Sequence, residues 1–140
     1  MIDDKERSAV NIENSKHRLF RELGKYEKSP FTTMYDVVLA AACIGYMNNS
    51  RVKLDNALKI FRWDDLPHRT HIPFLHALAL AETEDDTILL NRNEILIVLE
   101  EYANGGINDL YDATIKKPGN ALPNLIDLIL EHGESRSDDE

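Results

Sequence analysis

This 140-residue sequence lacks several features that commonly identify a function. Cys43 is the only cysteine, which excludes an intramolecular disulfide and a cysteine-based zinc site. No GxxxxGK[ST] or GxGxxG motif is present, so neither common phosphate-binding loop is predicted. The longest nearly uncharged run, residues 30–47, contains Asp36 and is too short for a membrane span. Residues 1–7 lack the apolar segment of a secretory signal, so we expect a cytoplasmic protein without membrane contact.

The length and the distribution of charge indicate how the chain is organised. A chain of 140 residues buries roughly two-thirds of its unfolded surface without metals or disulfides, so we predict one domain over residues 1–133. Residues 134–140 have nothing to bury and are expected to form a disordered acidic tail. The net charge of −9 is unevenly placed: residues 1–81 carry 12 Lys and Arg against 10 Asp and Glu, whereas residues 82–140 carry 4 against 15. The second half would therefore repel a nucleic-acid backbone.

The run at residues 30–47 predicts a buried central helix. Thr32 or Thr33 can supply the cap, and Asp36 lies in the first turn, where the helix dipole favours an anion. Apolar and small residues cover nearly all of its sides, so other elements must surround it. The predicted fold class is mainly α, a compact helical bundle around this helix.

The remaining elements follow from apolar spacing and from turn residues. Gly105 and Gly106 are expected to stop the helix that Asn91 and Glu94 open. The alternation of polar and apolar residues near 51–63 indicates a minor β-hairpin, with strands at 52–54 and 60–63. The other helices are expected from shortly after residue 8 to Gly24, from Thr70 to Ala81, from Ile107 to Thr114, and from Leu122 to His132. The last of these places Leu122, Leu125, Ile126 and Ile129 on one face.

Residue types that could carry catalysis or hold a metal do not occur in recognisable patterns. The histidines His68, His71 and His76 lack the HExxH order of a helical zinc site, and nearby prolines interrupt a regular helical face. Cys43 lies between Ala42 and Ile44 and is interpreted as a small core residue. We therefore predict no catalytic residue, no cofactor site and no metal site.

A basic segment between residues 51 and 71 is the first candidate binding surface. Guanidinium groups and exposed aromatic rings, here Phe61 and Trp63, can hold phosphates and stack on bases. The alternative is a mixed-charge surface that pairs with Asp55, Asp64 and Asp65, with Trp63 closing the core. The candidate anion or nucleic-acid contacts are Arg51, Lys53, Lys59, Arg62, His68, Arg69 and His71.

An acidic run after the Thr70–Ala81 helix is the second candidate surface. It could dock on a basic patch of a partner protein, and its carboxylates could alternatively bind a divalent cation in a nuclease or hydrolase. It lacks the spacing and the glycine of a calcium loop. Its members are Glu82, Glu84, Asp85 and Asp86.

Several ordered blocks of sequence resemble a known family. These blocks are PFTTMYDVVLAAACIGYMNNSRVKLDN, an Ile-Phe-Arg-Trp-Asp segment, LALAETEDDTILL and LEEYANGGINDL. Over residues 19–130 the chain resembles Dnd system-associated protein 4, a family of small proteins encoded beside bacterial DNA phosphorothioation clusters. The resemblance implies a role near a modification and restriction system that defends against phage, and it implies no reaction and no catalytic residues.

These observations lead to one functional prediction and two alternatives. We expect a non-catalytic accessory or regulatory protein that contacts other proteins of the defence cluster through its acidic half. Residues 51–71 would then face DNA or a second partner. The first alternative is a DNA-binding regulator that uses the 51–71 segment, and the second is the nuclease or hydrolase component.

Overall fold

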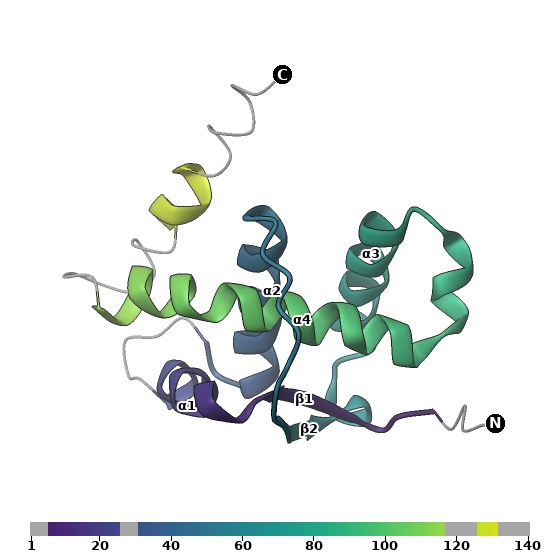
Figure 1. Ribbon diagram of the computed structural model, residues 1–140, viewed down its shortest axis with the longest axis horizontal. Coiled ribbons are helices and arrows are strands. Elements are labelled where there is room, and N and C mark those ends of the chain that lie inside the picture. Colours follow the sequence, from purple (N-terminus) through teal and green to yellow (C-terminus); the bar gives the residue numbers. More distant parts are fainter. Residues whose placement is uncertain (1–5, 26–30, 117–125, 132–140) are drawn as a thin grey trace.

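The longest helix, α4 (Arg92–Tyr111), is the element on which the rest of the chain packs (Figure 1). This computed structural model describes residues 6–25, 31–116 and 126–131. The side chain of Asn91 caps α4 by accepting a hydrogen bond from the backbone N–H of Glu94 at 3.2 Å, as predicted. Most of the helix is buried on several sides, so α4 rather than the 30–47 helix is the centre of the bundle.

The predicted central helix is α2 (Met34–Met47), and it crosses α4. Thr33 is the cap, since its hydroxyl accepts from the backbone N–H of Asp36 at 3.3 Å. The predicted start at residue 30 lies outside the described residues. Seven of the fourteen residues of α2 are buried, which confirms that it belongs to the core.

The helices α2 and α4 approach so closely that their backbones touch at glycines. A Cβ atom at Gly45 would lie 2.0 Å from the carbonyl oxygen of Tyr102, and one at Gly106 would lie 2.0 Å from that of Ala41. The prediction that Gly105 and Gly106 stop a helix is therefore wrong, because α4 continues through both of them to Tyr111. Gly106 makes room for the crossing helix α2, and Gly105 makes room for the backbone of Ser50, which follows α2.

Among the described residues, two strands, β1 (Ala9–Glu13) and β2 (Ala57–Arg62), pair antiparallel to form a small sheet. A strand does form within 51–63, but the predicted hairpin partner is wrong: β2 pairs with β1, and residues 51–54 form no strand. The N-terminal helix also starts later than predicted, because Val10 and Ile12 alternate into the core as part of β1. The carboxylate of Glu13 fixes the entry to β2 by accepting the backbone N–H of Asp55 at 2.7 Å.

The segment of residues 51–56, here called the crossing segment, passes over α4 on the side away from α2 (Figure 1). The side-chain amide of Asn104 donates to the carbonyl oxygens of Val52 and Lys53, both at 3.2 Å. The backbone N–H of Val52 donates to the carbonyl of Glu101 at 3.1 Å. The helix α4 is thus covered on one side by α2 and on the opposite side by the crossing segment.

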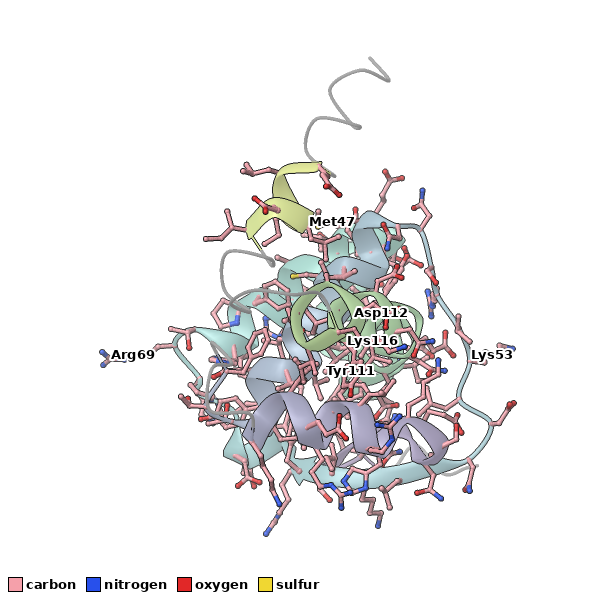
Figure 2. All side chains as sticks on the ribbon, turned by 90° about the vertical axis from the view of Figure 1, so that its left-hand side faces the viewer. Met47, Lys53, Arg69, Tyr111, Asp112 and Lys116 are labelled. Carbon is pink, nitrogen blue, oxygen red and sulfur yellow. The ribbon has the colours of Figure 1, made fainter. Side chains whose placement is uncertain are left out.

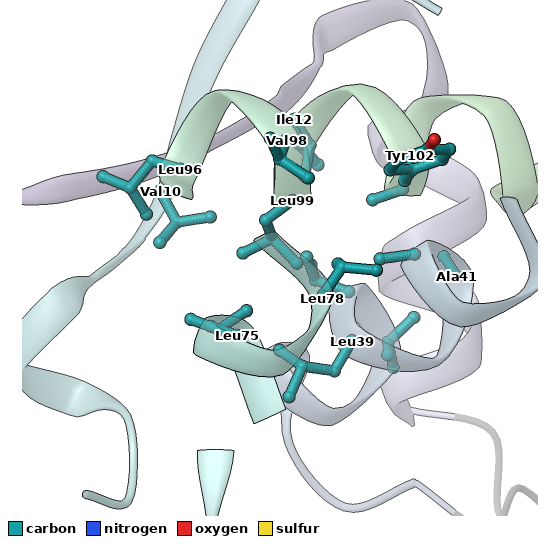
Figure 3. Packing of buried hydrophobic residues seen from close by; sticks show 14 of the residues in the cluster. Val10, Ile12, Leu39, Ala41, Leu75, Leu78, Leu96, Val98, Leu99 and Tyr102 are labelled. Carbon is teal, nitrogen blue, oxygen red and sulfur yellow. The ribbon is translucent and has the colours of Figure 1, made fainter. Parts of the chain in front are cut away.

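Two further helices complete the described bundle. They are α1 (His17–Lys25) and α3 (His71–Thr83), and the second confirms the predicted helix after Thr70. Leu75 and Leu78 of α3 lie in the same hydrophobic cluster as Leu99 of α4 (Figure 3). Short helical turns occupy Asn14–Lys16, Trp63–Asp65, Asp86–Leu90 and Asp112–Lys116.

The predicted last helix is described only in part. Residues 126–131 are helical, with Ile126 and Ile129 exposed, while Leu122 and Leu125 lie outside the described residues. The predicted tail at 134–140 also lies outside them. Among the described helices, none has both the length and the apolar character needed to cross a bilayer.

Candidate functional site

The predicted basic residues do not form one surface. Lys53 and Arg69 extend from opposite sides of the molecule (Figure 2). Lys53 belongs to the crossing segment beside α4, whereas Arg69 precedes α3 on the far side of the core. A single straight nucleic-acid backbone would therefore not contact the whole set at once.

Arg51 is held in an ion-pair cluster with helices α3 and α4. Its Nε donates to Glu101 at 2.7 Å, and its Nη1 donates to Glu82 at 2.6 Å. Its guanidinium carbon also lies 5.9 Å from the centre of the Tyr102 ring, and the Tyr102 hydroxyl donates to Glu82. Arg51, predicted as a basic contact, and Glu82, predicted as an acidic one, thus pair with each other. This cluster anchors the start of the crossing segment.

The Tyr102 hydroxyl gives this cluster a measurable pH dependence. Burial and the hydrogen bond to Glu82 raise the pKa of Tyr102 to about 12. The contribution of the neutral phenol is complete below its ordinary pKa of 10.0 and is lost as pH rises towards about 12. We expect Tyr102→Phe to lower the free energy of unfolding by about 1 kcal/mol at neutral pH.

That difference should shrink as pH rises through the same window. Chemical denaturation of the native chain and the variant at a series of alkaline pH values measures it. A difference between the two proteins that stays constant across the window would contradict the assigned hydrogen bond.

His71, another predicted contact, joins the starts of α2 and α3. Its Nε2 lies 2.6 Å from Asp36, and its Nδ1 lies 2.7 Å from the hydroxyl of Thr70. Its ring packs perpendicular to that of Tyr35, with 5.0 Å between the ring centres. Across the part of the chain that the structure describes, no three His, Cys, Asp or Glu side chains are placed to hold a metal ion.

The aromatic residues of the basic segment are largely occupied by internal contacts. Trp63 is buried, 7% exposed, beneath the guanidinium of Arg92 at 4.8 Å. Phe61 packs edge-on against Tyr35, with 6.0 Å between ring centres. Trp63 therefore closes the core, as one of the two interpretations of this segment expected. The exposed members of the predicted basic set are Lys53, Lys59, Arg62, His68 and Arg69, apart from the ion-paired Arg51.

The acidic run lies at the end of α3, where the chain turns towards α4. Glu84 adopts a left-handed conformation with a φ of 55°, which ends the helix. Asp85 accepts from the backbone N–H and the hydroxyl of Thr87 at 3.0 and 2.8 Å, and these bonds lower the pKa of its carboxyl group. Glu84, Asp85 and Asp86 are all exposed, so three of the four predicted acidic residues face solvent.

An apolar groove between α2 and α3 was not predicted from the sequence. It has a volume of about 240 Å³, and none of its lining residues is charged. Apolar spacing showed that both helices are hydrophobic on most sides, but spacing does not reveal which side the fold leaves uncovered. The residues that line the groove are Cys43, Tyr46, Met47, Phe74, Ala77, Leu78 and Ala81.

One end of this groove is electronegative. The helices α2 and α3 run parallel, since Asp36 meets His71 at their starts while Met47 and Ala81 line the groove near their ends. Their carboxyl-terminal ends therefore lie at the same end of the groove, and each carries the partial negative charge of a helix dipole. The exposed carboxylate of Glu84 follows immediately after α3. The apolar groove thus ends close to an exposed carboxylate, that of Glu84.

Comparison with known proteins gives one match. A protein-family model described as DNA sulphur modification system-associated protein 4 matches residues 9–140. This confirms the resemblance found over residues 19–130. No curated protein and no solved structure matches the chain.

Proposed function

Because the chain belongs to the DNA sulphur modification system-associated protein 4 family, we propose that it is a non-catalytic accessory protein of a bacterial anti-phage defence system based on DNA phosphorothioation. It acts by binding other proteins of that system. The association with DNA sulphur modification comes from the family, whereas the accessory role is argued from the surface of the molecule.

The exposed groove between α2 and α3 is the observation that carries this proposal. Solvent-exposed apolar surface costs free energy, and contiguous patches of it commonly mark sites of protein association. The groove has no charged lining residue, so it offers little to a phosphate or to a small ionic substrate. The exposed carboxylate of Glu84, directly after α3, adds a charge that can orient a basic partner.

Co-purification with the products of neighbouring genes tests the proposal. The full chain, carrying an affinity tag, is expressed with each product in turn, and we expect at least one to be retained in a defined ratio. Reversing two exposed acidic charges, Glu84→Lys with Asp86→Lys, should reduce retention. The matched control, Asp55→Lys with Asp64→Lys, changes the net charge by the same amount at positions away from the acidic run, and it should retain the partner. Retention of none of the products would reject the accessory role.

The DNA-binding alternative rests on the exposed residues of the basic set. Lys59 and Arg62 both lie on β2, and the guanidinium of Arg62 pairs with the exposed carboxylate of Asp64 only at 4.0 Å. If these residues bind phosphates, the affinity for labelled duplex DNA must fall steeply as salt rises. The accessory role predicts weak binding that Lys59→Glu with Arg62→Glu leaves almost unchanged. A strong, salt-dependent affinity that this pair of substitutions abolishes would favour the alternative.

A further inference from the structure

The chemistry of the groove specifies its partner more closely than the accessory role does. Resting on that proposed function, we infer that the α2–α3 groove binds an amphipathic helix of a partner protein. The apolar stripe of that helix enters the groove, and its lysine or arginine residues lie at the end near Glu84. The occupant is therefore a basic amphipathic helix.

The shape of the groove fits one face of a helix. Along α3 the lining runs from Phe74 to Ala81, which at the rise of an α-helix corresponds to about 10 Å, or two turns. Ala77 and Ala81 are small and exposed, so the wall of α3 is low between the larger side chains. A helix presents apolar side chains at positions i, i+3 or i+4, and i+7 over that length, and such a stripe matches the groove.

The charge around the groove determines the sign of the partner. The carboxyl-terminal ends of α2 and α3, each with a partial negative charge, lie at the same end of the groove, and the exposed Glu84 follows α3 there. Asp85 and Asp86 are exposed on the turn that continues towards α4. Glu82 lies at the same end, but its carboxylate is already paired with Arg51. The whole chain carries a net charge of −9, so a second copy would bring like charges together. Cationic side chains complement this surface, whereas an acidic or neutral helix does not.

Two synthetic peptides test the inference directly. One is a short leucine–lysine peptide patterned as an amphipathic helix, and the other has glutamate at every lysine position. Cys43 lines the groove and is half-buried, so its rate of reaction with a maleimide reports whether the groove is occupied. We expect the leucine–lysine peptide to slow that reaction in the native chain and the leucine–glutamate peptide to leave it unchanged. Equal protection by both peptides, or by neither, would overturn the inference.

A pair of variants separates the groove from general charge attraction. Ala77→Glu places a carboxylate in the groove, and Leu90→Glu places one at a site that is 88% exposed outside it. Both variants are more negative than the native chain, so charge attraction alone predicts tighter binding of the leucine–lysine peptide to each. The groove predicts binding at least ~10-fold weaker for Ala77→Glu, because the new charge would be desolvated. Equal affinity of the two variants, measured by peptide anisotropy, would exclude the groove as the binding site.

The acidic end is tested by removing charge without changing shape. The variant Glu84→Gln, Asp85→Asn, Asp86→Asn retains a capping side chain at residue 85. It should bind the leucine–lysine peptide several-fold more weakly and with a smaller salt dependence. An unchanged affinity would show that these carboxylates do not select a basic partner.

The same variants distinguish failure of this inference from failure of the proposed function. If a neighbouring gene product co-purifies equally well with the native chain and with Ala77→Glu, the accessory role stands and the groove is not the site used. If the peptide binds in the groove but no neighbouring product co-purifies, the accessory role fails. Self-association of the native chain that Ala77→Glu abolishes would instead identify a second copy as the occupant.

Discussion

Replacing Gly106 with alanine should lower the free energy of unfolding by about 3 kcal/mol, although alanine is the better helix former by about 1 kcal/mol. A Cβ atom there would lie 2.0 Å from the carbonyl oxygen of Ala41 and 2.5 Å from the backbone nitrogen of Gly45. Both atoms belong to the backbone of α2, so no side-chain rotation relieves the overlap. The two helices must separate, and the contacts along their crossing weaken. Denaturant titration measures the change.

Gly24 provides the matched control. An added Cβ atom there has as its nearest neighbour the Val37 side chain at 3.9 Å, which is an ordinary van der Waals contact. Gly24→Ala should therefore leave stability unchanged or raise it slightly. If Gly106→Ala is as stable as Gly24→Ala, the close crossing of α2 and α4 is incorrect.

Removing the side chain of Arg7 should have the second large effect, a loss of about 2 kcal/mol in the free energy of unfolding. Arg7 pairs with the carboxylate of Glu100 on α4, which is 5% exposed and also accepts the backbone N–H of Asn11 at 2.6 Å. In Arg7→Ala the carboxylate would remain buried without its cation. The double variant Arg7→Ala with Glu100→Gln removes that charge and should regain part of the loss.

The pH dependence of this pair has a defined sign. Burial raises the pKa of Glu100 above its ordinary 4.5, although Arg7 and Asn11 oppose that shift. The folded protein therefore holds this proton more tightly than the unfolded chain, so the contribution of Glu100 to stability falls as pH rises above 4.5. Without Arg7 the pKa rises further. The stability gap between Arg7→Ala and the double variant should thus widen from acidic to neutral pH, and a gap independent of pH would contradict the assignment.

Local signals in the sequence predicted the elements whose stability is decided locally. Thr33 and Asn91 are caps whose side chains accept hydrogen bonds from backbone N–H groups three residues further on. The starts of α2 and α4 could therefore be predicted from the sequence. Gly105 and Gly106 gave the same local signal as a helix end, but the contact that requires them comes from a distant segment. The strand β1 was missed for a similar reason, because its partner lies more than forty residues away.

The candidate site shows the same division. The sequence identified Arg51 and Glu82 as charged residues on two surfaces, but their pairing depends on how α3 and the crossing segment meet α4. The groove is present because the other described residues leave part of α2 and α3 uncovered, and no periodicity in the sequence reports this. Trp63 was the exception, since burial in the core was one of the two interpretations that its surroundings allowed.

The position of α4 between α2 and the crossing segment has a consequence for biosynthesis. The elements that precede residue 91 and pack on α4 emerge from the ribosome before α4 does. They include α2, α3 and both strands. Gly45 and the carbonyls of Val52 and Lys53 then have no partner until α4 appears. The apolar surfaces of these earlier elements therefore stay exposed in the nascent chain until α4 has been synthesised. We expect folding to be completed only when α4 packs between the segments that precede it in the sequence.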